Sequence, residues 1–216
     1  MTPTTDVSLR FFFHPQSRAR TVRWMLEECE ARYDPVQLEF GTSMKSAEYL
    51  RINPLGQVPT LMDGDTVITE TAAILAYLAD KFPEKHLAPP LGSTARGEYY
   101  RWLFFVAGAA EATTARMYGW LQEPAQWRSA APGFGQFDAV VQTLEKAVSG
   151  RQTLCENHFS AADVYMASYL GWGMAVGALP QKEAFLAYAT PLLQRPASVR
   201  SNALDGPIAP KPSAAA

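Results

Sequence analysis

The sequence predicts an α/β domain followed by an all-helical domain. Short strand-like runs alternate with helical patterns up to residue 82, whereas no strand pattern appears from residue 93 onward. The segment between them carries three prolines and a glycine, which are typical of a break between elements. We therefore predict a first domain at 1–83, a linker at 84–92 and a helical domain at 93–200. Residues 201–216, rich in Pro and Ala, are predicted to be a disordered tail.

The first half of the α/β domain reads as strand, helix, strand and short helix. Residues 7–13 are strand-like, and residues 18–31 are helical because Val22, Met25, Leu26 and Cys29 recur at helical spacing. A second strand is predicted at 33–40 and a short helix at 45–51.

The second half of the α/β domain reads as a hairpin followed by a helix. Residues 58–62 and 66–68 are strand-like and flank Asp63-Gly64, a strong hairpin signal. A helix begins near Thr71, because apolar residues such as Ile74 and Leu78 follow at helical spacing. The resulting order, β-α-β-α-β-β-α with a proline opening the third strand, fits a thioredoxin-like fold with a mixed sheet.

The helical domain begins with a long helix. We predict it at 95–121, bent near Gly108, with a loop at 123–135 and a second helix at 137–148. Ser160 and Asp163 then stand at the two positions of a capping box, so we assign them to folding rather than to chemistry.

Composition excludes several classes of protein. The 216 residues are 48% apolar and 19% charged, and a net charge of -2 gives no footprint for nucleic acid or anionic membrane. No signal peptide or membrane-spanning run is seen, so we expect a cytoplasmic protein. Cys29 and Cys155 lack the spacing of a redox or zinc motif, and His14, His86 and His158 are scattered, so no metal is expected.

The proline in the third strand indicates a ligand site. Pro59 removes a ladder donor, so it belongs at a bend, where a cis Val58-Pro59 bond is plausible. A cis bond would turn the Val58 N–H and C=O outward, where an extended peptide could pair with them as an added strand. The alternative is that Pro59 simply ends a loop.

The start of the next helix could hold both charges of an amino-acid end. Free N–H groups and the Thr71 hydroxyl suit a carboxylate, and Glu70 supplies a negative charge for an ammonium group. This is the chemistry of a γ-glutamyl group. The alternative is that Thr69, Glu70 and Thr71 only cap the helix.

These segments closely resemble the glutathione-binding half of the glutathione S-transferases. The resemblance rests on residues 52–61 (INPLGQVPTL), Asp63-Gly64 and residues 68–78 (ITETAAILAYL). It implies glutathione as co-substrate, backbone pairing at Val58, γ-glutamyl contacts from Glu70 and Thr71, and a contact from Gln57 at the glycine end. It also implies a homodimer.

Ser17 is the candidate group that activates the glutathione thiol. The thiolate is the nucleophile, and a hydrogen-bond donor or a helix N-terminus lowers the pKa of a thiol. Ser17 carries the only hydroxyl in residues 13–20, and Ser17-Arg18 resembles the Ser-Arg type of bacterial and fungal glutathione transferases. Gln16, however, stands where the serine of that type aligns. Ser17 as a plain helix cap remains the alternative, with His14 and Gln16 as other donors.

The resemblance implies a detoxifying transferase that conjugates glutathione to hydrophobic electrophiles. Candidate electrophile contacts are His14, Phe105, Tyr118 and Trp172, although an aromatic stripe at helical spacing is also typical of a core. The Ser-Ser-Cys-Ser signature of the zeta-type isomerases is absent. A glutathione-dependent peroxidase or dehalogenase, and a non-catalytic glutathione-binding protein with the same fold, remain alternatives.

Overall fold

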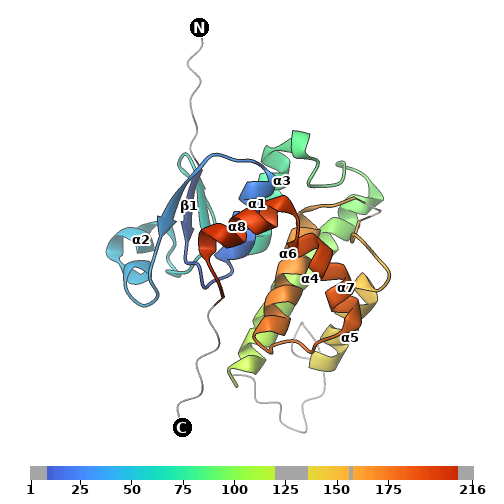
Figure 1. Cartoon of the computed structure of the whole chain (residues 1–216). Coiled ribbons are helices and arrows are strands. Elements are labelled where there is room, and N and C mark those ends of the chain that lie inside the picture. Colours follow the sequence, from blue (N-terminus) through green and yellow to red (C-terminus); the bar gives the residue numbers. More distant parts are fainter. Residues whose placement is uncertain (1–8, 120–135, 156–157, 209–216) are drawn as a thin grey trace. The chain divides into compact units, whose positions relative to one another are not determined.

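The computed structural model describes residues 9–119, 136–155 and 158–208. These residues form two compact units (Figure 1): 9–85 together with 196–208, and 86–195. Each unit is described by itself.

The first unit is a four-stranded mixed sheet with helices, in the predicted order β-α-β-α-β-β-α. Its elements are β1 (Leu9–Phe13), α1 (Ala19–Glu28), β2 (Tyr33–Gln37), a 3-10 turn (Ser43–Lys45), α2 (Ala47–Ile52), β3 (Thr60–Asp63), β4 (Thr66–Ile68), α3 (Thr71–Lys81) and a 3-10 turn (Pro83–Lys85). The strand order is β2-β1-β3-β4. Strand β1 runs parallel to β2 and antiparallel to β3, and β4 is antiparallel to β3. The predicted thioredoxin-like fold is confirmed.

Alternation along β1 distributes its aromatic side chains between two cores. Phe12 packs with Leu38, Met44 and Tyr49 on the side of α2. Its neighbours point the other way, because successive strand side chains alternate. Figure 1 shows α1, α3 and the C-terminal helix α8 (Pro196–Asp205) on that opposite side of the sheet.

Helix α8 corrects the predicted tail. It runs from Pro196 to Asp205 and packs against α1 in the first unit, although residues 201–216 were expected to be disordered and 93–200 to belong to the helical domain. The reason is a buried ion pair 2.8 Å long between Asp205 and Arg23 of α1. This ion pair could not be predicted from the local composition near residue 205, because Arg23 lies 182 positions earlier in the sequence.

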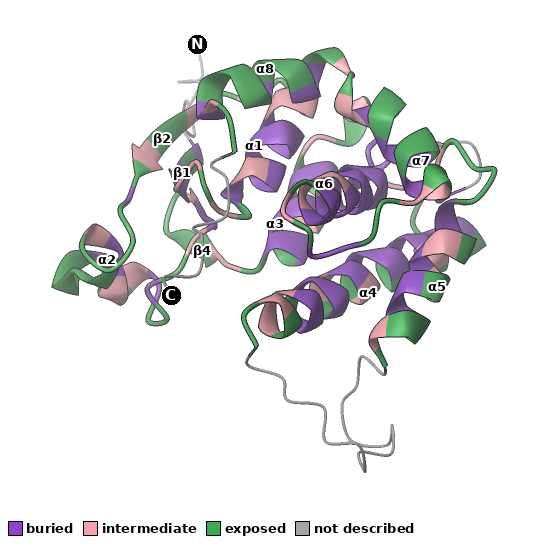
Figure 2. Cartoon of the chain, turned by 60° about the horizontal axis from the view of Figure 1, so that its bottom comes forward, coloured by how far each residue is buried: buried purple, intermediate pink, exposed green. Residues whose placement is uncertain are grey.

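The second unit is a bundle of helices around α6. Its helices are α4 (Thr94–Met117), α5 (Phe137–Val148), α6 (Ala161–Ala175) and α7 (Glu183–Leu193). Helix α4 continues through Gly108, and the predicted loop at 123–135 lies outside the described residues. Helix α6 is buried along most of its length (Figure 2).

The predicted capping box opens α6. Its Asp163 carboxylate accepts hydrogen bonds from the Ser160 N–H at 2.8 Å and from the Tyr188 hydroxyl at 2.6 Å. Burial raises the pKa of Asp163, and these hydrogen bonds oppose that shift. Among the described helices, none is long and apolar enough to cross a membrane.

Candidate functional site

Three segments of the first unit meet at one end of the sheet. Phe12 near the end of β1 pairs with Thr60 at the start of β3, so the chain leaves β1 at the end where it enters β3. Leu61 pairs with Ile68, so β4 also ends there. This register brings together residues 14–18 (the first turn), residues 57–59 (the proline loop) and the N-terminus of α3.

The proline loop presents the unpaired backbone N–H and C=O of Val58. The Val58-Pro59 bond is cis. Within the ranges that the structure describes, neither the N–H nor the C=O of Val58 has a hydrogen-bond partner. Val58 is half-buried and Gln57 is exposed, so an extended peptide could reach both.

Three buried polar side chains hold the proline loop from behind. The Gln57 carbonyl accepts hydrogen bonds from the Tyr49 hydroxyl at 2.6 Å and from Asn53 Nδ2 at 2.9 Å. Tyr49 and Asn53 both also bond Thr60 Oγ1, at 2.9 and 3.1 Å. Burial raises the pKa of Tyr49, and its hydrogen bonds to Thr60 and Asn53 oppose that shift.

The supporting role of these three residues was not predicted from the sequence, although Asn53 and Thr60 belong to the motif at 52–61. The one sequence signal was Thr60, a hydroxyl residue inside an apolar strand-like run. The structure shows that Thr60 is fully buried, so its hydroxyl needs a hydrogen-bond partner. We name Tyr49, Asn53 and Thr60 the neutral network.

The N-terminus of α3 begins at Thr71, as predicted, with Thr71 and Ala72 each 7% exposed. Glu70 precedes it with φ +66°, a left-handed conformation that costs free energy for a residue other than glycine. Among the described residues, the Thr71 hydroxyl and the N–H groups of Thr71, Ala72 and Ala73 have no hydrogen-bond partner. Such N–H groups and the helix dipole favour an anion. The exposed Glu70 carboxylate adds a negative charge beside them.

Ser17 caps the first turn in this structure. Its hydroxyl donates to the His14 carbonyl at 2.8 Å and accepts from the Ala19 N–H at 3.1 Å. The Ser17 N–H also donates to the His14 carbonyl. A hydroxyl hydrogen rotates freely about its bond, so Ser17 could redirect its donor without breaking the backbone bonds of the turn.

His14 joins the first turn to the loop after β2. Its Nδ1 accepts the Gln16 N–H at 3.1 Å, so Nε2 carries the hydrogen and faces Glu39 Oε2 at 3.3 Å. The imidazole also packs on Phe40, with ring centroids 4.2 Å apart. His14 therefore orders the turn that contains Ser17.

Neither cysteine lies at this site. Cys29 is buried at the end of α1, and burial raises the pKa of its thiol to about 12. A thiol with so high a pKa is a poor nucleophile. Cys155 is buried in the second unit.

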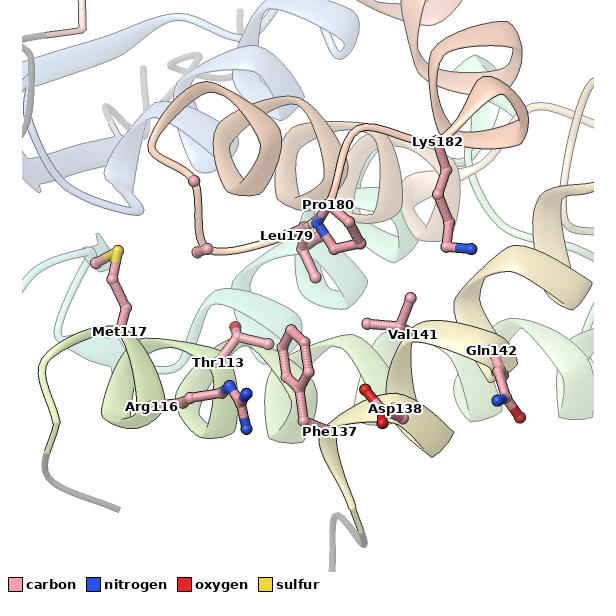
Figure 3. Close-up of a pocket in the computed structure, with 12 residues that line it drawn as sticks. Thr113, Arg116, Met117, Phe137, Asp138, Val141, Gln142, Leu179, Pro180 and Lys182 are labelled. Carbon is pink, nitrogen blue, oxygen red and sulfur yellow. The ribbon is translucent and has the colours of Figure 1, made fainter. Parts of the chain in front are cut away.

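The second unit contains a cavity of about 660 Å³, a size common for small-molecule sites (Figure 3). It lies between the last turns of α4, the first turns of α5 and the segment after α6. Its apolar wall includes Met117, Phe137 and Leu179, and Arg116 lies over the Phe137 ring at 4.3 Å.

The predicted electrophile contacts do not line this cavity. Phe105 is half-buried against Trp102, Tyr118 is exposed at the end of α4, and Trp172 is half-buried on α6. His14, the fourth candidate, belongs to the first unit. The register of the sheet therefore brings Gln57, Val58, Pro59, Glu70, Thr71 and Ser17 to one end of the sheet of the first unit, and the three aromatic candidates belong to the second unit.

Comparisons with known proteins agree with this fold. Residues 7–80 match the family model for the glutathione S-transferase N-terminal domain. Glutathione S-transferase GST-4.5 of Xanthomonas campestris pv. campestris is 32% identical over 141 residues, 63% of this chain and 69% of that protein. Glutathione S-transferase GstA of Escherichia coli O157:H7 is 30% identical over 130 residues, 60% of this chain and 63% of that protein, which is less than two thirds.

A solved structure agrees over almost the whole chain. A sphingomonad glutathione S-transferase complexed with glutathione has a TM-score of 0.72 and 29% identity, covering 91% of this chain and 98% of that chain. The molecule is thus a thioredoxin-like domain joined to a helical domain. The chain belongs to the glutathione S-transferase family.

Proposed function

We propose that the protein is a glutathione transferase that joins the glutathione thiolate to hydrophobic electrophiles. The observation that carries the proposal is the pairing of two open groups at one end of the sheet. One is the backbone N–H and C=O of Val58, and the other is the N-terminus of α3 with Glu70 beside it. Together they match an extended peptide that carries a carboxylate and an ammonium group at one end. Family membership supports the choice of glutathione.

Each open group receives one part of glutathione. The Thr71 hydroxyl and N–H bind the γ-glutamyl carboxylate, and Glu70 pairs with the ammonium group. Val58 pairs with the peptide backbone beside the cis Pro59, and Gln57 hydrogen-bonds the glycine end. These contacts hold the thiol without activating it.

Ser17 activates the thiol in this proposal. Its hydroxyl turns from the His14 carbonyl toward the sulfur and stabilises the thiolate, while its oxygen still accepts the Ala19 N–H. The thiol proton leaves to solvent. The thiolate then forms a carbon–sulfur bond to the electrophile, and the leaving group departs with its bonding electrons. Lowering the thiol pKa from about 8.5 by about 2 units, roughly 2.7 kcal/mol, would make most of the thiol reactive at neutral pH.

The electrophile belongs to the aromatic surface of the second unit in this proposal. Phe105, Tyr118 and Trp172 supply apolar area there. We also assign the protein to the cytoplasm, to detoxification and to a homodimeric state, because the family resemblance implies them.

The ultraviolet absorbance of the glutathione thiolate tests the proposal. It is titrated against pH on the wild type, Ser17→Ala and Ser17→Thr, with conjugation of an activated aryl halide measured in parallel. We expect a lowered thiol pKa in the wild type, a higher thiol pKa with less turnover in Ser17→Ala, and partial recovery in Ser17→Thr, which keeps the hydroxyl. The proposal would be contradicted if the wild type bound glutathione without lowering the pKa of its thiol and did not conjugate the aryl halide.

Thr71→Ala is the matched control for binding. It removes a hydroxyl from the γ-glutamyl end and leaves the first turn intact. We expect the Kd for glutathione to rise about tenfold, because a hydrogen bond to a charged group contributes about 1.5 kcal/mol or more. The thiol pKa of the bound glutathione should not change.

A non-catalytic glutathione-binding protein is the second candidate. The favouring observation is that Ser17 already uses both its donor and its acceptor as a cap. In that case Ser17→Ala would lower stability and leave the thiol pKa unchanged. The absorbance titration distinguishes the two functions.

A further inference from the structure

The C-terminal helix reaches the first turn from the far end of the chain. Helix α8 packs against α1 in the first unit. Just past α8, the Pro207 carbonyl accepts a hydrogen bond from Gln16 Nε2 at 3.0 Å. Residues separated by 191 positions thus meet beside Ser17.

Arg20 connects the first turn to α8. One terminal nitrogen, Nη1, donates to the Pro15 carbonyl at 3.0 Å and to the Asp205 carbonyl at 3.4 Å. The other, Nη2, donates to Asn202 Oδ1 at 2.9 Å. Because the guanidinium is planar and presents its donors in a fixed fork, fixing its two ends on α8 also fixes its contact with Pro15.

The α8 end of this connection is itself anchored. Asp205 is buried and pairs with Arg23 at 2.8 Å, and the Arg23 guanidinium lies 4.1 Å from the Phe13 ring of β1. Burial lowers the pKa of Arg20, and the Asp205 carboxylate opposes that shift. The anchor is therefore a helix end held against the strand that leads into the first turn.

We propose that α8 positions the first turn for thiol activation, with Arg20 as the positioning residue. The inference rests on the proposed function. The Pro15 carbonyl is held by Arg20, and the neighbouring His14 carbonyl accepts the Ser17 N–H, so these two carbonyls set the position of Ser17 in the turn. Releasing Pro15 widens the range of Ser17 positions, and a misplaced group loses much of its effect on a reaction. The glutathione contacts at Val58 and Thr71 do not involve Arg20.

The test compares Arg20→Gln and Asn202→Ala with Arg200→Gln. Asn202 is exposed, and among the described residues its side chain is linked to the first turn through Arg20. Arg200 is the matched control, because it joins α8 to Glu27 of α1 without touching the first turn. Arg20→Lys, which keeps the charge and loses the fork, measures how far charge alone suffices.

We expect Arg20→Gln to lower kcat about tenfold and to raise the pKa of the bound thiol by about one unit, with little change in the KM for glutathione. Asn202→Ala should shift the same quantities in the same direction by a smaller factor, and Arg200→Gln should shift neither. Hydrogen exchange of the amides at 16–19 should be faster in Arg20→Gln. This last readout needs no turnover.

Three results would overturn the inference. If the wild type lowers the thiol pKa and Arg20→Gln and Asn202→Ala leave it unchanged, α8 has no role in activation, while the proposed function stands. If Arg200→Gln acts as strongly as Arg20→Gln, any loosening of α8 suffices and Arg20 has no special role. If the wild type binds glutathione with an unshifted thiol pKa, the proposed function fails and this inference fails with it.

Discussion

The first turn and the proline loop lie at the same end of the sheet but are supported in different ways. The proline loop is held by the neutral network, whose members Tyr49, Asn53 and Thr60 lie within eleven positions of one another in the chain. The first turn is held by the charged Arg20 side chain, which donates to the Asp205 carbonyl 185 positions away, and the Asp205 carboxylate is in turn paired with Arg23.

The proline loop is thus stabilised by residues close to it in the sequence, whereas the first turn is stabilised by residues from the far end of the chain. Neutral hydrogen bonds close to the ligand loop form as soon as α2 and β3 are in place. The charged connection forms only when the C-terminus returns to the first unit, and it includes a buried ion pair whose desolvation costs free energy. Four predictions test this contrast, in order of decreasing expected effect.

Asp205→Ala should produce the largest loss of stability. It leaves the Arg23 guanidinium, only 4% exposed, without its carboxylate partner. Removing one member of a buried ion pair typically costs about 3–5 kcal/mol. The measurement is the free energy of unfolding in urea.

The double variant Arg23→Met with Asp205→Leu is the control for that loss. Replacing both members by apolar residues of similar size is often close to neutral, so most of the lost stability should return. If the double variant is as unstable as Asp205→Ala, packing of α8 rather than the unpaired charge explains the loss.

Asn53→Ala should produce the next largest loss. Its side chain donates to the Gln57 carbonyl and to Thr60 Oγ1, and it accepts the Leu55 N–H at 3.1 Å. Losing these bonds in a buried site should cost about 2–3 kcal/mol in urea unfolding and weaken glutathione binding. Asn202→Ala, at an exposed asparagine, should stay within about 0.5 kcal/mol. Equal losses in the two variants would argue against the neutral network.

The elements predictable from the sequence were those with local signals. The hairpin at Asp63-Gly64, the helix start at Thr71, the capping box of Ser160 and Asp163 and the helix at 137–148 all depend on residues a few positions apart. The bend at Pro59 was likewise predictable, because the proline itself causes it.

The parts that sequence reasoning missed depend on distant partners. Helix α8 was not predicted, because its last turn is stabilised by the ion pair with the distant Arg23 and its local composition gives no helix signal. The strand expected at 33–40 ends at Gln37, and the helix expected at 18–31 ends at Glu28. Boundaries of this kind are decided by pairing and packing that no local pattern contains.

Tyr49→Phe should cost less than Asn53→Ala. It deletes one hydroxyl, which donates to the Gln57 carbonyl at 2.6 Å, and it keeps the ring packed on Phe12. We expect a loss of about 1 kcal/mol in urea unfolding and a small rise in the Kd for glutathione, because Asn53 still bonds the same carbonyl. A loss as large as that of Asn53→Ala would show that the hydroxyl, rather than the amide, dominates the neutral network.

The smallest effect is a pH dependence that only the charged support should have. Burial raises the pKa of Asp205 in the folded protein, and the charges of Arg23 and Arg20 oppose this shift. The contribution of Asp205 to stability is therefore fully present below its unfolded-state pKa of about 3.9, and it is lost as the pH rises through its folded-state pKa. The stability of the wild type relative to Asp205→Asn should therefore fall over that window. Burial raises the pKa of Tyr49 above its ordinary value of 10.0, so Tyr49 stays neutral and the difference between wild type and Tyr49→Phe should be flat from about pH 4 to about pH 9. Urea unfolding of the three proteins across pH checks both slopes, and a slope in the Tyr49 pair or a flat line in the Asp205 pair would contradict the division into neutral and charged support.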